Sequence, residues 1–466
     1  MHVECGKGRP IRQEGDEVQT SLRAYLNDLE QRRQLLTVRR EVDPQFELNA
    51  VVRKIQSGPN LPVLFERVRG CTYPVVSNVL GNYGLVAGVL GVRIGEVARH
   101  WAERMSAPVP EDAESPDREP TLEEIPLSAI PHITFSEKDA GPYLTASVVV
   151  ARDPQSGVVN LSYHRMQIVS DSELRCRLST SGDLFRIQQM METRNEPLDV
   201  VVAIGLPPIV NLAAATTAGP LVSEYDVAAR LAGRRFATRA SPMSALPVPV
   251  TTEFLIEGQI LPGVRRREGP FGEWMDYYVP PTDNHVLSIK KVYARQSAIF
   301  YAISSGSKEE LVMSSMPIAG LVFNGIRTWV PSVRDVTCFP HPQFCVVKVG
   351  DASEGQARKA ILAAFGAEMN RMLYCVAVDE DVDIHDWQDF LWAMATRCRP
   401  DQDIFQIPGV PSFARDPHRV HWGRLGIDAT KPVDHADAFE RKKVPGMEAI
   451  DLREYIDSSE SSPTNF

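Results

Sequence analysis

The region from Thr145 to Ser304 consists mostly of segments that alternate polar and apolar residues or run apolar, which is the pattern of β-strands. These segments are TASVVVARD, VVNLSYHRMQIV, DVVVAIG, VPVTTEFLIEGQI, HVLSIKKVYAR and SAIFYAISS, separated by turn-type clusters such as DPQSG. Several strands with only a helix or two between them favour a closed or partly closed sheet. The sequence therefore predicts a barrel or split barrel in the middle of the chain.

Both flanks of this region mix helical and extended patterns. Near the N-terminus, LRAYLNDLEQRRQLL places Leu22, Leu26, Leu29 and Leu36 near one helix face, and LTVRREV alternates like a strand. After Ser315 the segments FCVVKV, GQARKAILAAFGAEMNRML, YCVAVDED and DWQDFLWAMATRC follow the order strand, helix, strand, helix. The flanks are therefore predicted to be α/β layers.

The stretch 106–130 is rich in Pro, Glu, Asp and Ser, as linkers and solvated arms are, and it marks a domain boundary. We predict four parts: an N-terminal α/β domain over 1–115, a split-barrel domain over 116–318, a C-terminal α/β domain over 319–440 and a tail over 441–466.

Composition restricts the partners and the compartment. The 466 residues include 50 Lys plus Arg and 60 Asp plus Glu, so a net charge of -10 argues against nonspecific binding to nucleic acids or anionic membranes. Seven scattered cysteines form no CxxC pair, and the first seventeen residues lack the apolar centre of a secretory signal. Prolines interrupt the longest apolar stretch, Val200 to Ala218. We expect a cytoplasmic protein with reduced thiols and no membrane span.

Two glutamates flank a glycine-rich turn in the hexapeptide EGPFGE. Gly269, Pro270 and Gly272 allow a sharp fold that can hold Glu268 and Glu273 close together. Two close carboxyl groups can divide the work of acid–base catalysis, one staying ionised and the other delivering a proton. Taken alone, however, a loop with two glutamates is usually a solvated turn.

The segment NLSYHR places an arginine inside an apolar strand. A buried guanidinium requires an anion, and Arg165 suits a carboxylate or a phosphate. Strict alternation puts Asn160, Ser162 and His164 on one face and Arg165 on the other, so a bulge is needed if Asn160 and Arg165 share a site. We interpret His164 as a core or surface histidine rather than a ligand.

A third cluster, VSEY, follows the small-residue run AAATTAGP. Glu224 could coordinate a hard cation, or it could lie in the first turn of a helix that Ser223 caps. The three arginines at 265–267 are typical of a solvated charge run, although their position just before Glu268 also makes them candidates for attracting an anionic substrate.

Taken in order, these motifs resemble the UbiD family of reversible decarboxylases. The family pattern N-x-x-x-x-R, then S-E-Y, then P-x-x-x-E-x-x-x-E-G, then E-G-P-F-G-E occurs here at Asn160/Arg165, Ser223/Glu224/Tyr225, Pro249/Glu253/Glu257/Gly258 and Glu268 to Glu273. The opening LRAYLNDLEQRRQLLTVRREVDPQFEL and the later VAVDEDVDIHDWQDFLWAMATRCRP and GRLGIDAT are also similar to the family.

The resemblance implies an α/β fold whose central split β-barrel, similar to flavin reductases, is flanked by N- and C-terminal α/β domains. It also implies prenylated FMN, a divalent metal that is normally Mn²⁺, and K⁺ near Thr216 and Thr217. The catalytic residues implied are Arg165, Glu268 and Glu273. The metal ligands are Asn160 and Glu224, and the cofactor contacts are Asn160, Ser162, Arg165, Thr180, Ser181, Glu224 and Arg424.

The chain departs from the family pattern at three places. The family's metal-binding histidine is absent from STSGD at 179–183, where Thr180, Ser181, Asp183 or water could substitute. Arg424 stands where relatives often have lysine, which preserves the positive charge. Asp276 occupies a common glycine position and Trp274 follows Glu273, so we expect a reshaped pocket.

The main hypothesis is a prenylated-FMN decarboxylase that acts reversibly on an aromatic, heteroaromatic or α,β-unsaturated carboxylic acid. In this resemblance Arg165 orients the carboxylate, Glu268 holds Arg165, and Glu273 supplies the proton that replaces carbon dioxide. The alternative is a UbiD-like protein that binds prenylated flavin without decarboxylating. Expected partners are the acid, a flavin prenyltransferase that supplies the cofactor, and further copies of the chain in a homodimer or larger homo-oligomer.

Overall fold

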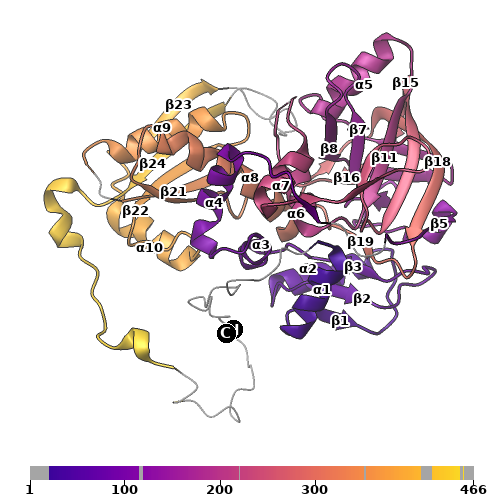
Figure 1. Ribbon diagram of the computed structural model, residues 1–466. Helices are drawn as coiled ribbons and strands as arrows, with labels where there is room; N and C mark the ends of the chain where they lie inside the picture. Colours follow the sequence, from indigo (N-terminus) through magenta and orange to yellow (C-terminus); the bar gives the residue numbers. More distant parts are fainter. Residues whose placement is uncertain are drawn as a thin grey trace.

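The computed structural model describes residues 20–114, 119–219, 221–350, 353–410, 422–451 and 455. Its three main sheets have four, nine and five strands. Figure 1 shows the small N-terminal sheet below a large curled sheet, with the C-terminal α/β layer beside them and helices α4 and α8 between. The N-terminal segment expected to lack a secretory signal lies outside the described residues. The six cysteines inside them form no disulfide.

The N-terminal layer places α1 (Leu22–Gln31) and α2 (Glu47–Ser57) with the strands β1 (Leu36–Val38), β2 (Val63–Phe65) and β3 (Val75–Ser77). Ser21 caps α1 by accepting a hydrogen bond from the Ala24 amide at 3.0 Å. Leu22, Leu26 and Leu29 are buried as their spacing predicts, whereas Leu36 begins β1 instead of extending the helix. The chain continues through α3 (Tyr83–Leu90) and α4 (Val97–Ser106).

The fourth strand of this layer comes from far along the chain. β19 (Phe300–Tyr301) lies within the segment SAIFYAISS, which the alternation assigned to the central sheet, but it pairs in parallel with β3. That expectation was wrong, because alternation identifies a strand and carries no information about its partner. The pairing joins the end of the central region to the N-terminal layer.

The central sheet contains most of the predicted strands. Along the sheet they run β6 (Tyr143–Leu144), β9 (Met166–Ser170), β10 (Glu173–Cys176), β18 (Thr282–Arg295), β15 (Phe254–Glu268), β11 (Leu198–Ile204), β7 (Val148–Arg152) and β8 (Val159–Tyr163), and β5 (Leu122–Ile125) pairs with β18. Three helices accompany the sheet: α5 (Asp183–Thr193), α6 (Pro208–Ala214) and α7 (Glu224–Ala232).

The connection between β8 and β9 shows how strongly this sheet curls. The two strands are six positions apart in the sheet, which in a flat sheet would separate them by about 29 Å. Only His164 and Arg165 connect them, and three Cα–Cα steps reach at most about 11 Å. The sheet therefore bends into a half-barrel whose opposite ends meet at these two residues, in agreement with the predicted partly closed sheet.

The C-terminal layer begins with α8 (Lys308–Arg327), followed by a five-stranded sheet with the order β20-β21-β22-β24-β23. The strands are β20 (Val333–Thr337), β21 (Phe344–Val349), β22 (Tyr374–Asp379), β23 (Ile404–Val410) and β24 (Trp422–Ala429), and the helices are α9 (Gln356–Ala367) and α10 (Trp387–Arg397). α8 packs against α4 so closely that a Cβ at Gly320 would lie 2.4 Å from Trp101 Cδ1. Only glycine fits there.

Short elements complete the structure: the strands β4 (Ala113–Glu114), β12 (Arg235–Phe236), β13 (Thr238–Ala240), β14 (Pro247–Pro249), β16 (Phe271–Gly272) and β17 (Tyr278–Val279), and 3₁₀ turns at Ile94–Glu96, Leu127–Ala129, Val433–Phe439 and Met447–Ala449. Of the helices in the described part of the chain, none is long and apolar enough to cross a membrane. The four-part division and its boundaries stay a prediction.

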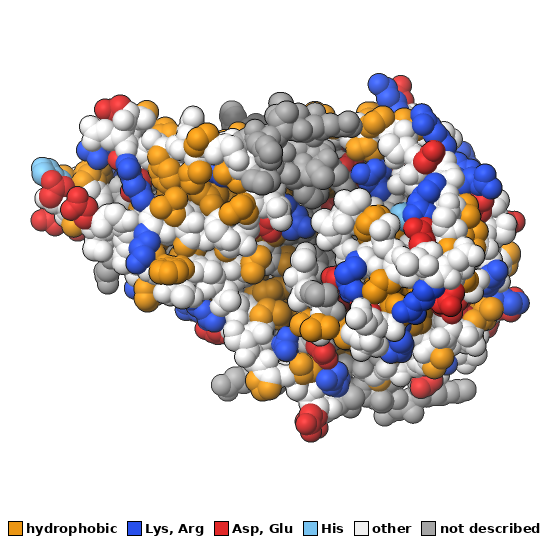
Figure 2. Space-filling view, turned by 90° about the horizontal axis from the view of Figure 1, so that it is seen from above, with side chains coloured by type: hydrophobic (Ala, Val, Ile, Leu, Met, Phe, Trp, Pro, Cys, Tyr) orange, Lys and Arg blue, Asp and Glu red, His pale blue; other side chains and the backbone are white. Residues whose placement is uncertain are grey.

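The two halves of the molecule differ in surface character. Figure 2 shows hydrophobic side chains gathered over the C-terminal half, whereas Lys and Arg are frequent over the half that contains the curled sheet. Leu321 and Trp329 at α8 and Leu362 and Met369 at α9 are each about half exposed or more.

Candidate active site

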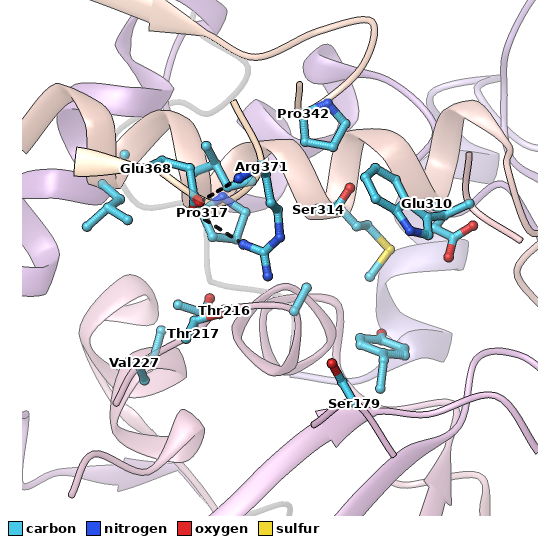
Figure 3. Close-up of a pocket in the computed structure, with 18 of the residues that line it drawn as sticks. Ser179, Thr216, Thr217, Val227, Glu310, Ser314, Pro317, Pro342, Glu368 and Arg371 are labelled. Carbon is cyan, nitrogen blue, oxygen red and sulfur yellow. Dashed lines mark hydrogen bonds and ion pairs between the residues drawn. The ribbon is translucent and has the colours of Figure 1, made fainter. Parts of the chain in front are cut away.

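A cavity of about 560 Å³ lies where the curled sheet, α4 and α8 meet. Its wall includes the β8–β9 connection, the turn after β15 and the segment that follows α9. Figure 3 shows Arg371 pointing toward Thr216 and Thr217 across one end, and Glu310 and Ser314 at the other. Elements that are distant in sequence therefore build one site.

Arg165 bridges the two glutamates of the EGPFGE turn. Its Nε and Nη2 donate to Glu268 Oε1 and Oε2 at 3.0 and 3.1 Å, and its Nη1 donates to Glu273 Oε1 at 2.7 Å. The three side chains are only 9%, 1% and 6% exposed, so these are buried ion pairs. The structure thus brings together all three predicted catalytic residues.

Local folding explains this meeting. β15 ends at Glu268, and Gly269 turns the chain with a φ of 90°, a conformation that side chains other than glycine rarely adopt. Arg165 reaches the turn because it lies in the two-residue connection between β8 and β9. The predicted bulge between Asn160 and Arg165 is thus replaced by a break of the strand after Tyr163.

The two glutamates have different surroundings. Glu268 also accepts hydrogen bonds from Tyr143 and Asn284 and is not part of the cavity wall, whereas Glu273 lines the cavity. Burial lowers the pKa of Arg165, but its bonds to the two glutamates outweigh burial, so the pKa lies above its usual value. The Arg165 guanidinium also lies 4.9 Å from the centre of the Phe271 ring. Arg165 therefore stays a cation.

Asn160 and Glu224 form a second buried pair. Asn160 Nδ2 lies 3.4 Å from both Glu224 oxygens, and the Leu161 amide donates to Glu224 Oε2 at 2.7 Å. Ser223 caps α7 and Glu224 lies in its first turn, as the helix reading of VSEY predicted, while the cation reading stays a prediction. Burial, with a contribution from the charge of Asp183, raises the pKa of Glu224 to about 8. Burial thus disfavours the ionised form of Glu224, and a nearby cation would stabilise that form.

The donor set fits a hard divalent cation. Asn160, Glu224 and Asp183 offer oxygen atoms, which Mn²⁺ and Mg²⁺ accept as ligands. In the described residues no cluster contains three His, Cys, Asp or Glu side chains, so a cation here would also need the amide oxygen of Asn160. Asp183 begins α5 and its charge acts on Glu224, whereas Thr180 and Ser181 are exposed and Ser181 lines the cavity; the substitute for the missing histidine stays a prediction.

His164 is buried at the cavity wall, and both of its ring nitrogens have hydrogen-bond partners in the protein. Its Nε2 lies 2.9 Å from Ser162 Oγ and its Nδ1 lies 3.0 Å from the Arg177 carbonyl oxygen. Ser162 Oγ in turn donates to Asn160 Oδ1 at 3.1 Å. Ser162 and His164 therefore orient the Asn160 amide.

The cavity contains cations that the sequence motifs did not indicate. Arg177, Arg230 and Arg371 line it, and Arg371 Nη1 pairs with Glu368 Oε2 at 3.4 Å. None lies in a recognised motif or at a distinctive spacing. Arg424, which we expected at the cofactor, is fully buried, donates to the Met369 carbonyl and lies outside the cavity wall.

Other predicted residues lie elsewhere. Arg265 pairs with Glu192 at 2.6 Å, Arg266 and Arg267 are exposed, and none of the three lines the cavity, so the solvated-run reading holds. The motif carboxylates Glu253 and Glu257 have structural roles.

Glu253 is fully buried and accepts from Arg23 at 2.8 and 2.7 Å, from Arg295 at 3.1 Å and from the Ile299 amide at 3.0 Å. It therefore joins α1 to the central sheet. Glu257 accepts from the Met243 amide at 3.1 and 3.0 Å.

Trp274 narrows the cavity beside Glu273. Its ring stacks on His341 with centroids 4.8 Å apart and an interplanar angle of 15°. His341 belongs to the C-terminal layer, and burial lowers its pKa, so it stacks as a neutral ring. Trp274 therefore forms an aromatic contact between the central region and the C-terminal layer, and the expected reshaping of the pocket stays a prediction.

Comparisons with known proteins agree with this geometry. Models of the N-terminal, Rift-related and C-terminal domains of 3-octaprenyl-4-hydroxybenzoate carboxy-lyase match residues 26–105, 109–308 and 312–429. An anhydromevalonate phosphate decarboxylase of Methanothermobacter thermautotrophicus is 31% identical over 416 residues, which cover 87% of this chain and 96% of that protein.

Solved structures extend the likeness. The UbiD-class enzyme HmfF of Pelotomaculum thermopropionicum, in complex with FMN, superposes with a TM-score of 0.88 and 34% identity over 94% of this chain and 100% of that chain. Vanillic acid decarboxylase of Sedimentibacter hydroxybenzoicus superposes with a TM-score of 0.83 and 25% identity, over 93% of this chain and 98% of that chain. The resemblance drawn from the motifs is confirmed, and the chain belongs to the UbiD family of carboxy-lyases.

Proposed function

We propose that this protein is a reversible, non-oxidative decarboxylase that uses prenylated FMN to act on an aromatic, heteroaromatic or α,β-unsaturated carboxylic acid. The observation that carries the proposal is Arg165, which bridges Glu268 and Glu273 at the wall of a 560 Å³ cavity. Solved relatives were obtained with FMN and with prenylated FMN, which supports the choice of cofactor.

Loss of carbon dioxide from an sp² carbon leaves an electron pair in the plane of the molecule, where the adjacent π system cannot accept it. Amino-acid side chains provide no sink for such a pair. The prenylated flavin supplies that sink when it is bound. The protein must then bind the carboxylate, keep the reacting carbon in place and deliver one proton.

Arg165 fits the first of these tasks. Its guanidinium is a permanent, planar cation whose orientation is fixed by two hydrogen bonds to Glu268 and one to Glu273. A cation held in place before the reaction stabilises charge without reorganising. Arg165 therefore orients the substrate carboxylate and stabilises the negative charge that moves during cleavage.

Glu273 fits the proton transfer. It lies 5% exposed on the cavity wall, so its carboxyl group can reach a substrate and regain a proton from water that enters the cavity. When it gives its proton to the carbon that lost carbon dioxide, Glu273 becomes a carboxylate. Arg165 Nη1, at 2.7 Å, stabilises that carboxylate.

The protein has residues that could bind the cofactor phosphate and the accompanying metal ions. Asn160, Glu224 and Asp183 would hold Mn²⁺, and the segment at Thr216 and Thr217 would hold K⁺. Arg177 and Arg371 are the cavity cations proposed to neutralise the phosphate. Arg424 would act indirectly, since its charge and that of Arg371 both act on Glu368.

The protein would depend on a flavin prenyltransferase, because an ordinary flavin lacks the modified ring. We also propose that it assembles as a homodimer or a larger homo-oligomer.

The test is to produce the protein together with a flavin prenyltransferase and to incubate it in D₂O with benzoic, furoic, pyrrole and cinnamic acids. We expect a flavin-like absorbance and deuterium at the carbon that loses carbon dioxide. Arg165→Met should abolish labelling, whereas Arg265→Met, which removes an arginine paired with Glu192 outside the cavity, should not. A coloured protein that labels no acid would support the non-decarboxylating alternative, and a colourless active protein would overturn both.

A further inference from the structure

Four hydrogen bonds converge on the Glu268 carboxylate. Oε1 accepts from Arg165 Nε and Tyr143 Oη, both at 3.0 Å, and Oε2 accepts from Arg165 Nη2 at 3.1 Å and Asn284 Nδ2 at 2.7 Å. A carboxylate has about four lone-pair positions, so this set of donors uses its full capacity. A protonated Glu268 would have to displace one of these four donors.

The two neutral donors are themselves held in place. Asn284 Nδ2 directs its second hydrogen to Thr282 Oγ1 at 3.1 Å, and Thr282 pairs with Glu268 in the β15–β18 ladder. Tyr143 is 1% exposed, and its ring packs 4.4 Å from the Phe271 ring. Burial, then the charge of Glu268, raises the pKa of Tyr143, so its hydroxyl remains a donor.

Other ionisable groups do not offer Glu268 a proton. Arg165 is a permanent cation. Burial, with the charge of Glu268, raises the pKa of the Cys176 thiol on β10, which therefore stays neutral. Burial raises the pKa of Asp139, but hydrogen bonds from the Gly272 and Ser136 amides, at 2.8 and 2.9 Å, act against that rise by favouring its carboxylate form. Glu273 contacts the same guanidinium from its other side.

We propose that Tyr143 and Asn284 are positioning residues that keep Glu268 a carboxylate and thereby fix Arg165, so that the proton delivered to the product comes from Glu273 alone. This inference rests on the proposed function for its catalytic meaning. The division of labour between the two glutamates is set by residues outside the EGPFGE turn, one from β6 and one from β18. Neither residue needs to contact the substrate or the cofactor.

Two single variants of the holoprotein test the proposal, Tyr143→Phe and Asn284→Ala. Each removes one hydrogen bond to a charged group, which corresponds to a shift of about one pH unit. We expect the acidic limb of the pH profile of kcat/KM to move upward by about one unit, with KM nearly unchanged. Tyr25→Phe removes a buried hydroxyl that donates to the Val79 carbonyl and should leave the profile unchanged.

A second measurement does not require turnover. Infrared difference spectra of the holoprotein at stepped pH report carboxyl protonation, and the Glu268 band is identified by its loss in Glu268→Gln. We expect this band to appear at higher pH in both variants than in the wild type. If it appears at the same pH in all three proteins, the positioning role is wrong. If it shifts while no acid is turned over, the positioning role stands and the proposed function fails. Should Tyr143→Phe not fold, Asn284→Ala decides alone.

Discussion

Glu268→Gln should lower kcat/KM far more than an ordinary carboxyl-to-amide change. Glutamine offers one oxygen and one NH₂ group, and the two Arg165 nitrogens donate to different oxygens of Glu268. Whichever way the amide turns, one Arg165 nitrogen faces NH₂, and either the Tyr143 hydroxyl must rotate to accept from NH₂ or the Asn284 NH₂ group must turn away. Removing one partner of a buried ion pair costs about 3–5 kcal/mol. If the same free energy is lost from the transition state because Arg165 is no longer held in its orientation, kcat/KM drops roughly 10²- to 10⁴-fold.

The assay is the kcat/KM of the holoprotein for an acid that the wild type decarboxylates. Glu192→Gln is the matched control, because Glu192 also pairs with an arginine, Arg265 at 2.6 Å, and accepts the Gly263 amide at 2.9 Å, yet lies outside the cavity wall. It should stay within a few-fold of the wild type. If Glu268→Gln behaved like Glu192→Gln while retaining its flavin absorbance, the reasoning about Arg165 would be refuted.

Three further predictions follow from individual sites. Glu273→Gln should retain the flavin spectrum but lose about 10²- to 10⁴-fold in kcat, because its amide oxygen can accept from Arg165 but has no acidic proton to give; a near-normal kcat would remove Glu273 from proton transfer. Asp183→Ala should lower the manganese content measured by elemental analysis and the rise in Tm that added Mn²⁺ produces; unchanged values would show that Asp183 is not a ligand. Burial lowers the pKa of His285 from 6.5 to about 4. Between these two pH values the unfolded chain binds a proton at His285 and the folded protein does not, so the free energy of unfolding falls as the pH decreases from about 6.5 toward 4. His285→Phe should flatten this fall in Tm, and parallel curves for the two proteins would contradict the explanation.

The sequence predicted the strands of the central sheet better than their partners. Alternating and continuous apolar runs identified the segments that became β7, β11, β15 and β18, of which β7 and β11 are buried on both faces. It could not place β19 in the N-terminal sheet, since pairing depends on which edges meet in space. It also could not show that β8 and β9 meet across the gap of a half-barrel, where the strand breaks at His164.

The site was predictable to the extent that its residues lie in local motifs. Arg165, Glu268 and Glu273 belong to two short segments, and the structure brings them within hydrogen-bond distance. Arg371 was missed because the sequence placed it in the predicted helix GQARKAILAAFGAEMNRML, whereas α9 ends at Ala367 and the segment after it turns into the cavity wall. Arg424 was placed at the cofactor by resemblance, but it is buried on β24, donates to the Met369 carbonyl and lies outside the cavity wall.

Glu268 and Glu273 illustrate why a motif alone cannot assign roles. Their side chains are chemically identical, lie five residues apart and contact the same guanidinium. What separates them is the number of donors brought by distant strands: Tyr143 lies 125 positions before Glu268, and Asn284 lies 16 after it. The long-range fold therefore determines which carboxyl group is held by four donors, while the turn fixes only that two carboxyl groups are present. An EGPFGE turn in a sheet that lacks these two donors would retain both glutamates without the same division between anchor and acid.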